Sequence, residues 1–311
     1  MDSWILPSTR IIFGCGYLGH RVAKLWRQAG DHTIAFTRCD DPTAEMIEAG
    51  VFTGQADVTK PESLAVLSRL PALGGMAPES LLFAVGYDRH SGTDIPSVCA
   101  GGLANVLAAL PPSVSRVIYI STTGVYGSAS REWVDERTPS DPQRDGGRAS
   151  LAAEQILAAH PLGRRSVILR MAGLYGPGRV PHLDKLRAGE PLPVPREGWL
   201  NLVHVDDAAR IVVAADAWLA ARSESPSDAD GPHIFCVSDG SPVRREDYYA
   251  EVARVLGTPP PVFTPPPADS PAAARAAVSR RISNEVMRRT LGVPLAYPSF
   301  REGLAAILGA S

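Results

Sequence analysis

A glycine-rich segment near the start of the chain has the spacing of a phosphate-binding loop. Gly14, Gly16 and Gly19 form a G-x-G-x-x-G pattern directly after a short apolar run. The first glycine allows a tight turn, the second lets a pyrophosphate approach the backbone, and the third lets a helix pack against a sheet. We therefore expect a dinucleotide here, against the alternative of a glycine turn without a ligand. The loop residues are Gly14, Cys15, Gly16, Tyr17, Leu18 and Gly19.

The end of the second apolar run bears on the choice of dinucleotide. Thr37 and Arg38 stand where an acidic residue usually holds the adenosine ribose of NAD. An arginine at this place favours the 2′-phosphate of NADP, which a guanidinium can grip with two parallel hydrogen bonds. We expect NADP in preference to NAD. In the alternative, Arg38 is a solvated charge, Asp40 holds the ribose, and the cofactor is NAD.

Other chemistries find little support in the residue types. The seven histidines show no HxxxH or HExxH spacing, so no metal site is expected. The four cysteines are scattered without a CxxC pair, which favours reduced thiols in the cytoplasm. A net charge of −2 gives no electrostatic reason to expect nucleic acid or a membrane surface as a partner. No apolar run is long enough to span a bilayer, and the N-terminus does not resemble a signal peptide.

The elements that must position these residues alternate along the first 170 residues. Short runs rich in Val, Ile, Leu and Phe are typical of strands that are buried on both faces. They are expected at 10–13, 33–37, 51–55, 81–86, 116–121 and 166–171. Helical patterns lie between them, such as 18–28 and a helix to residue 70 that a Thr59-x-x-Glu62 capping box would open. This alternation predicts an α/β protein with a doubly wound, parallel Rossmann sheet.

The pattern changes after Gly173, where proline and glycine become frequent up to residue 198. A strand and a helix return later, and further helices are expected at about 245–256 and at 300–308. We predict a Rossmann domain over residues 1–172, with a returning segment at about 200–240. Residues 173–199 and 241–311 are expected to form a smaller, discontinuous C-terminal substrate lobe.

Several segments in this order resemble the extended short-chain dehydrogenase/reductase family, also called NAD-dependent epimerase/dehydratases. They are GCGYLG, the ADV step at 56–58, YISTTGVYG, LRMAGLYGPG, NLVHVDDAA and HIFCVSDGSPV. The resemblance runs over nearly the whole chain, and the order of the segments is more specific than any single one. The GxGxxG form, in place of TGxxGxxG, resembles the atypical YeeZ-like branch of the family.

The resemblance implies roles for particular residues. Thr122, four residues before Tyr126 of VYG, stands at the family's place for the catalytic Ser/Thr, and Ser121 and Thr123 are the alternatives. Besides the glycine loop, Thr37 and Arg38, the residues implied to bind the cofactor are Asp57, Val58, Ala84, Val85, Gly86 and Ser121. The residues implied to face or support a substrate cleft are Tyr126, Tyr175, Asn201 and His204, each of which also has a plain structural interpretation.

The family's general acid is the tyrosine of a YxxxK motif, whose lysine lowers the pKa of that tyrosine and holds the nicotinamide ribose. Aligned on the Ala-Glu pair at 153–154, the tyrosine position holds Gly146 and the lysine position holds Ser150. The chain contains no YxxxK, and no lysine between Lys60 and Lys185. Tyr126 is expected to lack a cationic neighbour, so its pKa should lie near ~10, which is poor for acid–base work at neutral pH.

Two functions of different class remain open. The first is an NAD(P)-dependent oxidoreductase or epimerase with an atypical active site and a nucleotide-sugar-like substrate, with Thr122, Tyr126 or the substrate itself moving the proton. The second is a non-catalytic NADP(H)-binding protein that senses redox state or holds a partner. The second lobe favours the enzyme, because a sensor needs no substrate cleft. Alanine-rich helices expected over 95–110 and 151–159 resemble the pair through which family members often dimerise, so a homodimer is expected.

Overall fold

The computed structural model describes residues 7–38, 43–72, 77–127, 132–222, 231–268, 270, 273 and 279–309. The chain divides into two compact units. The first, called the sheet unit, contains Met1–Ser121, Arg148–Leu169 and Ala209–Ile234. The second unit contains Thr122–Gly147, Arg170–Ala208 and Phe235–Ser311. The chain therefore passes between the units several times. The domain bounds expected from the sequence, with a first domain over 1–172 and a returning segment at about 200–240, stay a prediction.

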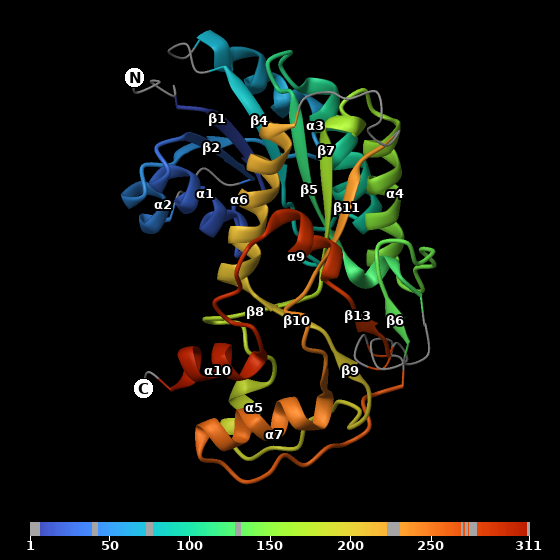
Figure 1. The fold of residues 1–311 in the computed structure, drawn as a ribbon. Helices are drawn as coiled ribbons and strands as arrows, with labels where there is room; N and C mark the ends of the chain where they lie inside the picture. Colours follow the sequence, from blue (N-terminus) through green and yellow to red (C-terminus); the bar gives the residue numbers. More distant parts are fainter. Residues whose placement is uncertain are drawn as a thin grey trace. The chain divides into compact units, whose positions relative to one another are not determined.

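A seven-stranded sheet has the strand order β3-β2-β1-β4-β5-β7-β11 (Figure 1). Its strands are β1 Thr9–Phe13, β2 His32–Thr37, β3 Phe52–Gln55, β4 Pro78–Phe83, β5 Arg116–Thr122, β7 Ser166–Met171 and β11 His233–Val237. The pairings that join β3, β2, β1, β4 and β5 are all parallel. This order is that of a doubly wound dinucleotide-binding sheet and confirms the expected fold class.

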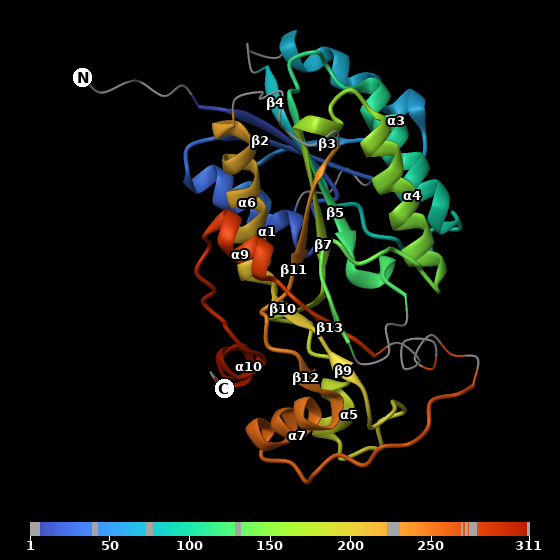
Figure 2. The ribbon, with the colours of Figure 1, turned by 45° about the vertical axis from the view of Figure 1, so that its right-hand side comes forward.

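Helices cover both faces of the sheet (Figures 1 and 2). They include α1 Gly19–Gln28, η1 Pro61–Ala72, η2 Ser97–Gly101, α3 Gly102–Ala109, α4 Asp145–Ala159 and α6 Val205–Ala221. Ile11 and Phe13 point to one face, where they share a core with Leu103 of α3 and Leu157 of α4. Because successive strand residues alternate between faces, Arg10 points to the opposite face, where its guanidinium lies over the ring of Trp26 in α1.

Short elements complete the connections: α2 Ala44–Glu48, η3 Thr123–Val125 and η4 Gly163–Arg165. The capped helix expected up to residue 70 is instead the 3₁₀ helix η1. The Thr59 hydroxyl donates to Asp57 Oδ1 at 2.7 Å. Among the described residues, no hydrogen bond joins Thr59 to Glu62, so the predicted capping box is wrong. The 3₁₀ segment begins at Pro61, one residue later than the helix that a Thr59 cap would open.

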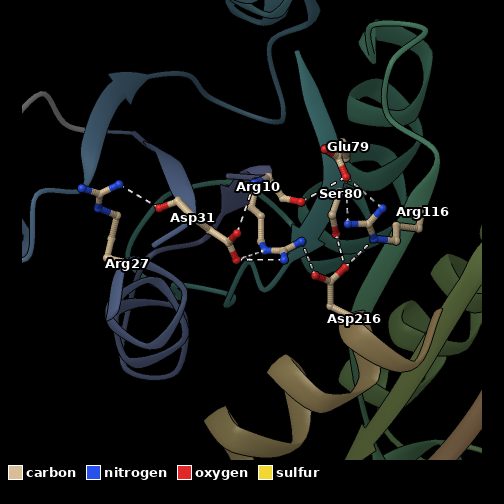
Figure 3. A network of polar contacts seen from close by, with 8 residues as sticks. Arg10, Arg27, Asp31, Glu79, Ser80, Arg116 and Asp216 are labelled. Carbon is tan, nitrogen blue, oxygen red and sulfur yellow. Dashed lines mark hydrogen bonds and ion pairs between the residues drawn. The ribbon is translucent and has the colours of Figure 1, made fainter. Parts of the chain in front are cut away.

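An ion network joins three strands of the sheet to α6 (Figure 3). Asp216 of α6 accepts hydrogen bonds from Ser80 Oγ at 2.6 Å and from Arg116 Nε at 2.9 Å. Its second carboxylate oxygen pairs with Arg10, which also binds Asp31 at 2.8 Å. The side chain of Asp216 is only 1% exposed. These partners lie near the beginnings of their strands, at the end of the sheet opposite the glycine turn, so the network ties the sheet to its helix.

The described part of the second unit contains short paired strands and several short α-helices. The paired strands are β8 Gly173–Tyr175 with β10 Leu202–His204, β9 Trp199–Leu200 with β12 Val243–Arg244, and β6 Trp133–Val134 with β13 Arg281–Ile282. The helices are α5 Leu183–Arg187, α7 Arg245–Leu256, α9 Glu285–Leu291 and α10 Phe300–Leu308. The positions of α7 and α10 confirm the two helices expected near the C-terminus. Within the described part of the chain, no helix is long and apolar enough to cross a membrane.

Candidate functional site

The turn from β1 into α1 requires glycine at two of its three glycine positions. Gly14 has a φ of +91°, and a Cβ there would come within 2.4 Å of the Ala84 backbone. A Cβ on Gly19 would come within 2.3 Å of the Gly14 carbonyl oxygen. A Cβ on Gly16, in contrast, would meet nothing within 4 Å. Gly14 and Gly19 therefore shape the turn, while Gly16 leaves its outer surface open to a ligand.

The guanidinium of Arg38, at the carboxyl end of β2, is paired with a carboxylate from a different strand connection. Arg38 Nη2 lies 3.2 Å from Asp88 Oδ2, and the two side chains are 51% and 44% exposed. The backbone of Arg38 is held as well, because Gln55 Nε2 donates to its carbonyl oxygen at 3.0 Å. Asp40, the alternative ribose ligand, lies outside the described residues.

Asp57 and Val58 follow the end of β3 and are held by their neighbours. Asp57 Oδ1 accepts hydrogen bonds from the Thr59 amide at 3.0 Å and the Thr59 hydroxyl at 2.7 Å. Burial opposes ionisation of Asp57, but these hydrogen bonds and the charges of Lys60 and Arg38 outweigh it and lower its pKa. Asn105 Nδ2 donates to the Val58 carbonyl oxygen at 2.9 Å. The Asp57 carboxylate is therefore ionised at neutral pH.

The expected cofactor residues converge on one edge of the sheet. Phe13 of β1 pairs with Phe36 of β2 on one side and Phe83 of β4 on the other, so the three strands end at the same level. The carboxyl ends of parallel strands meet at one edge, which is where doubly wound sheets bind ligands. The edge thus brings together the glycine turn, Arg38 and the 84–86 segment. A Cβ on Gly86 would meet nothing within 4 Å, so this segment also presents open backbone.

The serine at the expected lysine position has a hydrogen-bond partner inside the sheet unit. Ser150 of α4 is hydrogen-bonded to the hydroxyl of Tyr119 in β5. One turn further along α4, Glu154 Oε1 accepts a hydrogen bond from Ser121 Oγ at 2.5 Å. Sequence reasoning missed Tyr119 and Glu154 as partners. The signal was present, because residues two apart on a strand and four apart on a helix share a face.

The expected tyrosine position lies at the first turn of α4. A Cβ on Gly146 would meet nothing within 4 Å, so this position borders open space. A Cβ on Gly147 would come within 2.3 Å of the Gly124 carbonyl oxygen, so this second glycine permits a close approach of two backbone segments. The GG pair therefore contains one residue that packing requires and one that it does not.

Thr122, the expected catalytic hydroxyl, begins a tight turn. Its Oγ1 accepts a hydrogen bond from the Gly124 amide at 3.0 Å, which leaves the hydroxyl proton to donate elsewhere. Arg280 clamps the same turn, since its guanidinium donates to the carbonyl oxygens of Thr123 and, at 3.1 Å, Gly127. Burial and then the nearby Arg144 charge lower the pKa of Arg280 to about 10. Arg280 thus fixes the backbone that carries Thr122.

Tyr126 has the cationic neighbour that the sequence analysis expected it to lack. Arg170 Nη1 donates to the Tyr126 hydroxyl at 2.9 Å, and its guanidinium carbon lies 4.9 Å from the ring centroid. The hydroxyl also lies 3.0 Å from Cys236 Sγ. Burial raises the pKa of Tyr126, and Arg170 offsets this only in part, so the expected pKa near 10 is wrong. Tyr126 is 2% exposed, which suits a structural hydroxyl better than a proton donor to a substrate.

Tyr175 and His204 are also buried, each only 1% exposed. The Tyr175 hydroxyl donates to the Ser299 carbonyl oxygen at 3.3 Å, and its ring meets the imidazole of His204 edge-on at 5.3 Å. His204 also stacks on Tyr297 at 3.8 Å, and its Nδ1 accepts a hydrogen bond from the Asp206 amide at 3.2 Å. These contacts give both residues a packing role, and contact with a substrate stays a prediction.

Asn201 joins the β9–β10 segment to β13. Its Nδ2 donates to the Arg280 carbonyl oxygen at 2.9 Å, and its Oδ1 accepts from the Ile282 amide at 2.7 Å. Both ends of the amide are therefore satisfied by backbone groups of the second unit. Among the described residues, no group of three or more His, Cys, Asp or Glu side chains is placed to hold a metal ion.

Residues 11–224 match the model of the NAD dependent epimerase/dehydratase family. The chain belongs to this family. Among its relatives, Protein YeeZ of Escherichia coli (strain K12) is 38% identical over 157 residues, which are 50% of this chain and 52% of YeeZ. Short-chain dehydrogenase/reductase family 42E member 1 of Macaca fascicularis is 28% identical over 275 residues, 78% of this chain and 66% of that protein. In these matches the chain spans about half to two thirds of its relatives.

A solved structure agrees with the family assignment over a longer span. A protein from Methylobacillus flagellatus, assigned as an NAD-dependent epimerase/dehydratase, superposes with a TM-score of 0.75 and is 31% identical. The match covers 97% of this chain and 98% of that one. The expected Rossmann fold and the resemblance to the extended short-chain dehydrogenase/reductase family are therefore confirmed. As a member of the epimerase/dehydratase family, the chain carries the glycine turn and the 122–126 turn, together with Gly146 and Ser150 in its α4 helix.

Proposed function

We propose that the chain binds a nicotinamide dinucleotide at the carboxyl edge of its sheet and acts on a small molecule as an oxidoreductase or epimerase. The observation that carries this proposal is the β1–α1 turn, where the backbone is open at Gly16 and at Gly86 across the edge. The first turn of α1 contains no acidic residue, which suits a pyrophosphate at the positive end of the helix dipole. Family membership supports the same cofactor class.

The pyrophosphate, the adenine and the 2′-phosphate each have a group in the sheet unit that fits them. The pyrophosphate would lie against the amides of the glycine turn, and the adenine against Asp57 and Val58. The 2′-phosphate of NADP would reach Arg38, whose exposed guanidinium can donate two hydrogen bonds. The bound nicotinamide supplies or accepts a hydride. The proposed cofactor is therefore NADP, with NAD as the alternative.

The cofactor proposal is tested with the Arg38→Ala variant. Loss of a charge-assisted hydrogen bond of about 1.5 kcal/mol or more should weaken NADPH binding about tenfold, with NADH binding unchanged. Isothermal titration calorimetry of both nucleotides measures this selectivity. Equal losses for the two nucleotides, or a native preference for NADH, would contradict the assignment of NADP.

Thr122 is the group that we propose to donate a hydrogen bond to the substrate oxygen. Its Oγ1 is occupied as an acceptor by the Gly124 amide, so its proton points elsewhere. Turnover can be sought with the cofactor and a panel of nucleotide sugars, with detection of the nicotinamide absorbance and of epimerised products. Thr122→Val should lose at least about tenfold in kcat/KM and keep its cofactor affinity, whereas Thr122→Ser should retain most activity. Equal activity of Thr122→Val and the parent would remove Thr122 from the mechanism.

A non-catalytic NADP(H)-binding protein is the second candidate, and one observation favours it. Serine and glycine at positions 150 and 146 supply no group that ionises near neutral pH. The Ser150 hydroxyl is in addition engaged with Tyr119, and the Gly146 position is open. This candidate predicts tight NADPH binding and no turnover of any panel substrate. A measurable kcat that depends on Thr122 would exclude it.

A further inference from the structure

The ion pair between Arg38 and Asp88 crosses the end of a third strand. Arg38 follows β2 and Asp88 belongs to the connection after β4, while β1 lies between these two strands. Neighbouring strands are about 4.8 Å apart, so β2 and β4 are separated by about 10 Å. The 3.2 Å contact between the two side chains therefore spans the carboxyl end of β1, where the glycine turn begins.

The carboxylate of Asp88 is held in place for this contact. Its Oδ1 accepts a hydrogen bond from the His90 amide at 2.9 Å, while Oδ2 faces Arg38. Its carbonyl oxygen accepts a second local bond, from Ser91 Oγ at 2.7 Å. The His90 amide and then the Arg38 guanidinium lower the pKa of Asp88, so the group is ionised at neutral pH. The Asp88 carboxylate is thus already paired with the guanidinium that would receive the 2′-phosphate.

The two nicotinamide dinucleotides differ in what they require of this pair. The 2′-hydroxyl of NAD carries no charge, so NAD can bind while Arg38 stays paired. The 2′-phosphate of NADP carries up to two negative charges and needs the donors of Arg38. Among the described residues, the Asp57 carboxylate also interacts with Arg38, and Lys60 lies 3.9 Å from that carboxylate. Lys60 offsets Asp57, and Asp88 remains as the competitor for the guanidinium.

We propose that Asp88 is a specificity-determining residue whose carboxylate competes with the 2′-phosphate of NADP for Arg38. Its effect is to hold the preference for NADP below the level that Arg38 alone would give. The inference rests on the proposed function, because it assumes that Arg38 receives the 2′-phosphate. The competition is modest, because solvent screens the attraction between exposed charges.

The test compares NADPH and NADH binding to Asp88→Asn by calorimetry at constant salt. Asparagine retains an oxygen for the His90 amide and removes the charge, so the variant should keep the local turn. NADPH should bind about two- to fivefold more tightly than to the parent, with NADH unchanged. The fragment 2′,5′-ADP should gain equally, and 5′-AMP should not. Asp184→Asn, which removes the same charge from a fully exposed side chain of the second unit, should change neither affinity.

The double variant Arg38→Ala/Asp88→Asn separates competition from simple repulsion. Competition requires that the gain in NADPH affinity disappears when Arg38 is absent. A gain that persists in the double variant, or an unchanged NADPH affinity in Asp88→Asn, overturns the inference. If Arg38→Ala is selective for NADPH while Asp88→Asn is neutral, only the inference fails. If Arg38→Ala weakens both dinucleotides equally, the cofactor assignment fails and the inference fails with it.

Discussion

At the scale of single residues, the three glycines of the β1–α1 turn have separate tasks. Gly16→Val should fold as stably as the parent, because a Cβ there meets nothing within 4 Å. It should lose most dinucleotide affinity, because the branched side chain fills the place of the pyrophosphate. Thermal unfolding and calorimetry on the same sample measure the two effects. Undiminished binding in folded Gly16→Val would show that the pyrophosphate lies elsewhere.

Gly14→Ala is the matched comparison and should unfold at a lower temperature than the parent. Its Cβ would lie 2.4 Å from the Ala84 backbone at a φ of +91°. A left-handed alanine alone costs about 1–2 kcal/mol, and the close contact adds to this. A melting temperature equal to that of the parent would contradict this view of the turn.

Sequence spacing predicts some of the side-chain contacts of the candidate site and not others. The positions of the glycine turn and of Arg38 at the ends of β1 and β2 could be predicted, because each depends on residues that are close in sequence. The pairs of Tyr119 with Ser150 and Ser121 with Glu154 were accessible from strand and helix periodicity. The Arg170 contact to Tyr126 was not, because 44 residues separate the two and no local pattern joins them.

At the scale of elements, one carboxylate of α6 binds two arginines of the sheet. Asp216→Ala should leave Arg10 and Arg116 buried without their shared partner, since the carboxylate binds both. Breaking a buried ion pair from one side costs about 3–5 kcal/mol. Urea unfolding should show this loss in the free energy of unfolding. Asp184→Asn serves as the control because its side chain is fully exposed, and an equal stability of Asp216→Ala and this control would contradict the assigned role.

The strands of the sheet were predictable because buried parallel strands are continuous apolar runs. The strand expected at 81–86 corresponds to β4, which is Pro78–Phe83 and so begins and ends earlier in the chain. The apolar character of the segment continues past the strand into the 84–86 segment, so composition alone does not mark the end. A returning segment at about 200–240 was expected from the sequence. The crossings at Thr122 and Arg148 were not, because they depend on contacts between segments that are distant in sequence.

At the scale of the whole molecule, one buried acid couples stability to pH. Burial raises the pKa of Asp239 from 3.8 to about 7, and the charges of Glu302 and Asp207 add to the rise. The folded protein therefore retains a proton that the unfolded chain releases above pH 4. The contribution of Asp239 to the free energy of unfolding should fall as pH rises from about 4 to about 7, by at most about 4 kcal/mol for a shift of this size.

The Asp239→Asn variant checks this linkage. Asparagine keeps an oxygen for the Ser241 amide, which donates to Asp239 Oδ1 at 2.8 Å. Between pH 5 and pH 7.5 the melting temperature of the parent should decrease more than that of the variant. Identical pH profiles for the two proteins would show that Asp239 titrates as it does in the unfolded chain.

Arginine supplies the positive charge in the network of Figure 3, and this has a practical consequence for labelling. Guanidinium groups do not react with amine-directed dyes or acetylating reagents under conditions that modify lysine. Only Lys24, Lys60 and Lys185 offer side-chain amines, and none belongs to that network. Fluorophores can therefore be coupled without disturbing the contacts that tie α6 to the sheet. A dye confined to Lys60 would lie beside Asp57, where its emission would test whether the proposed adenine position is occupied.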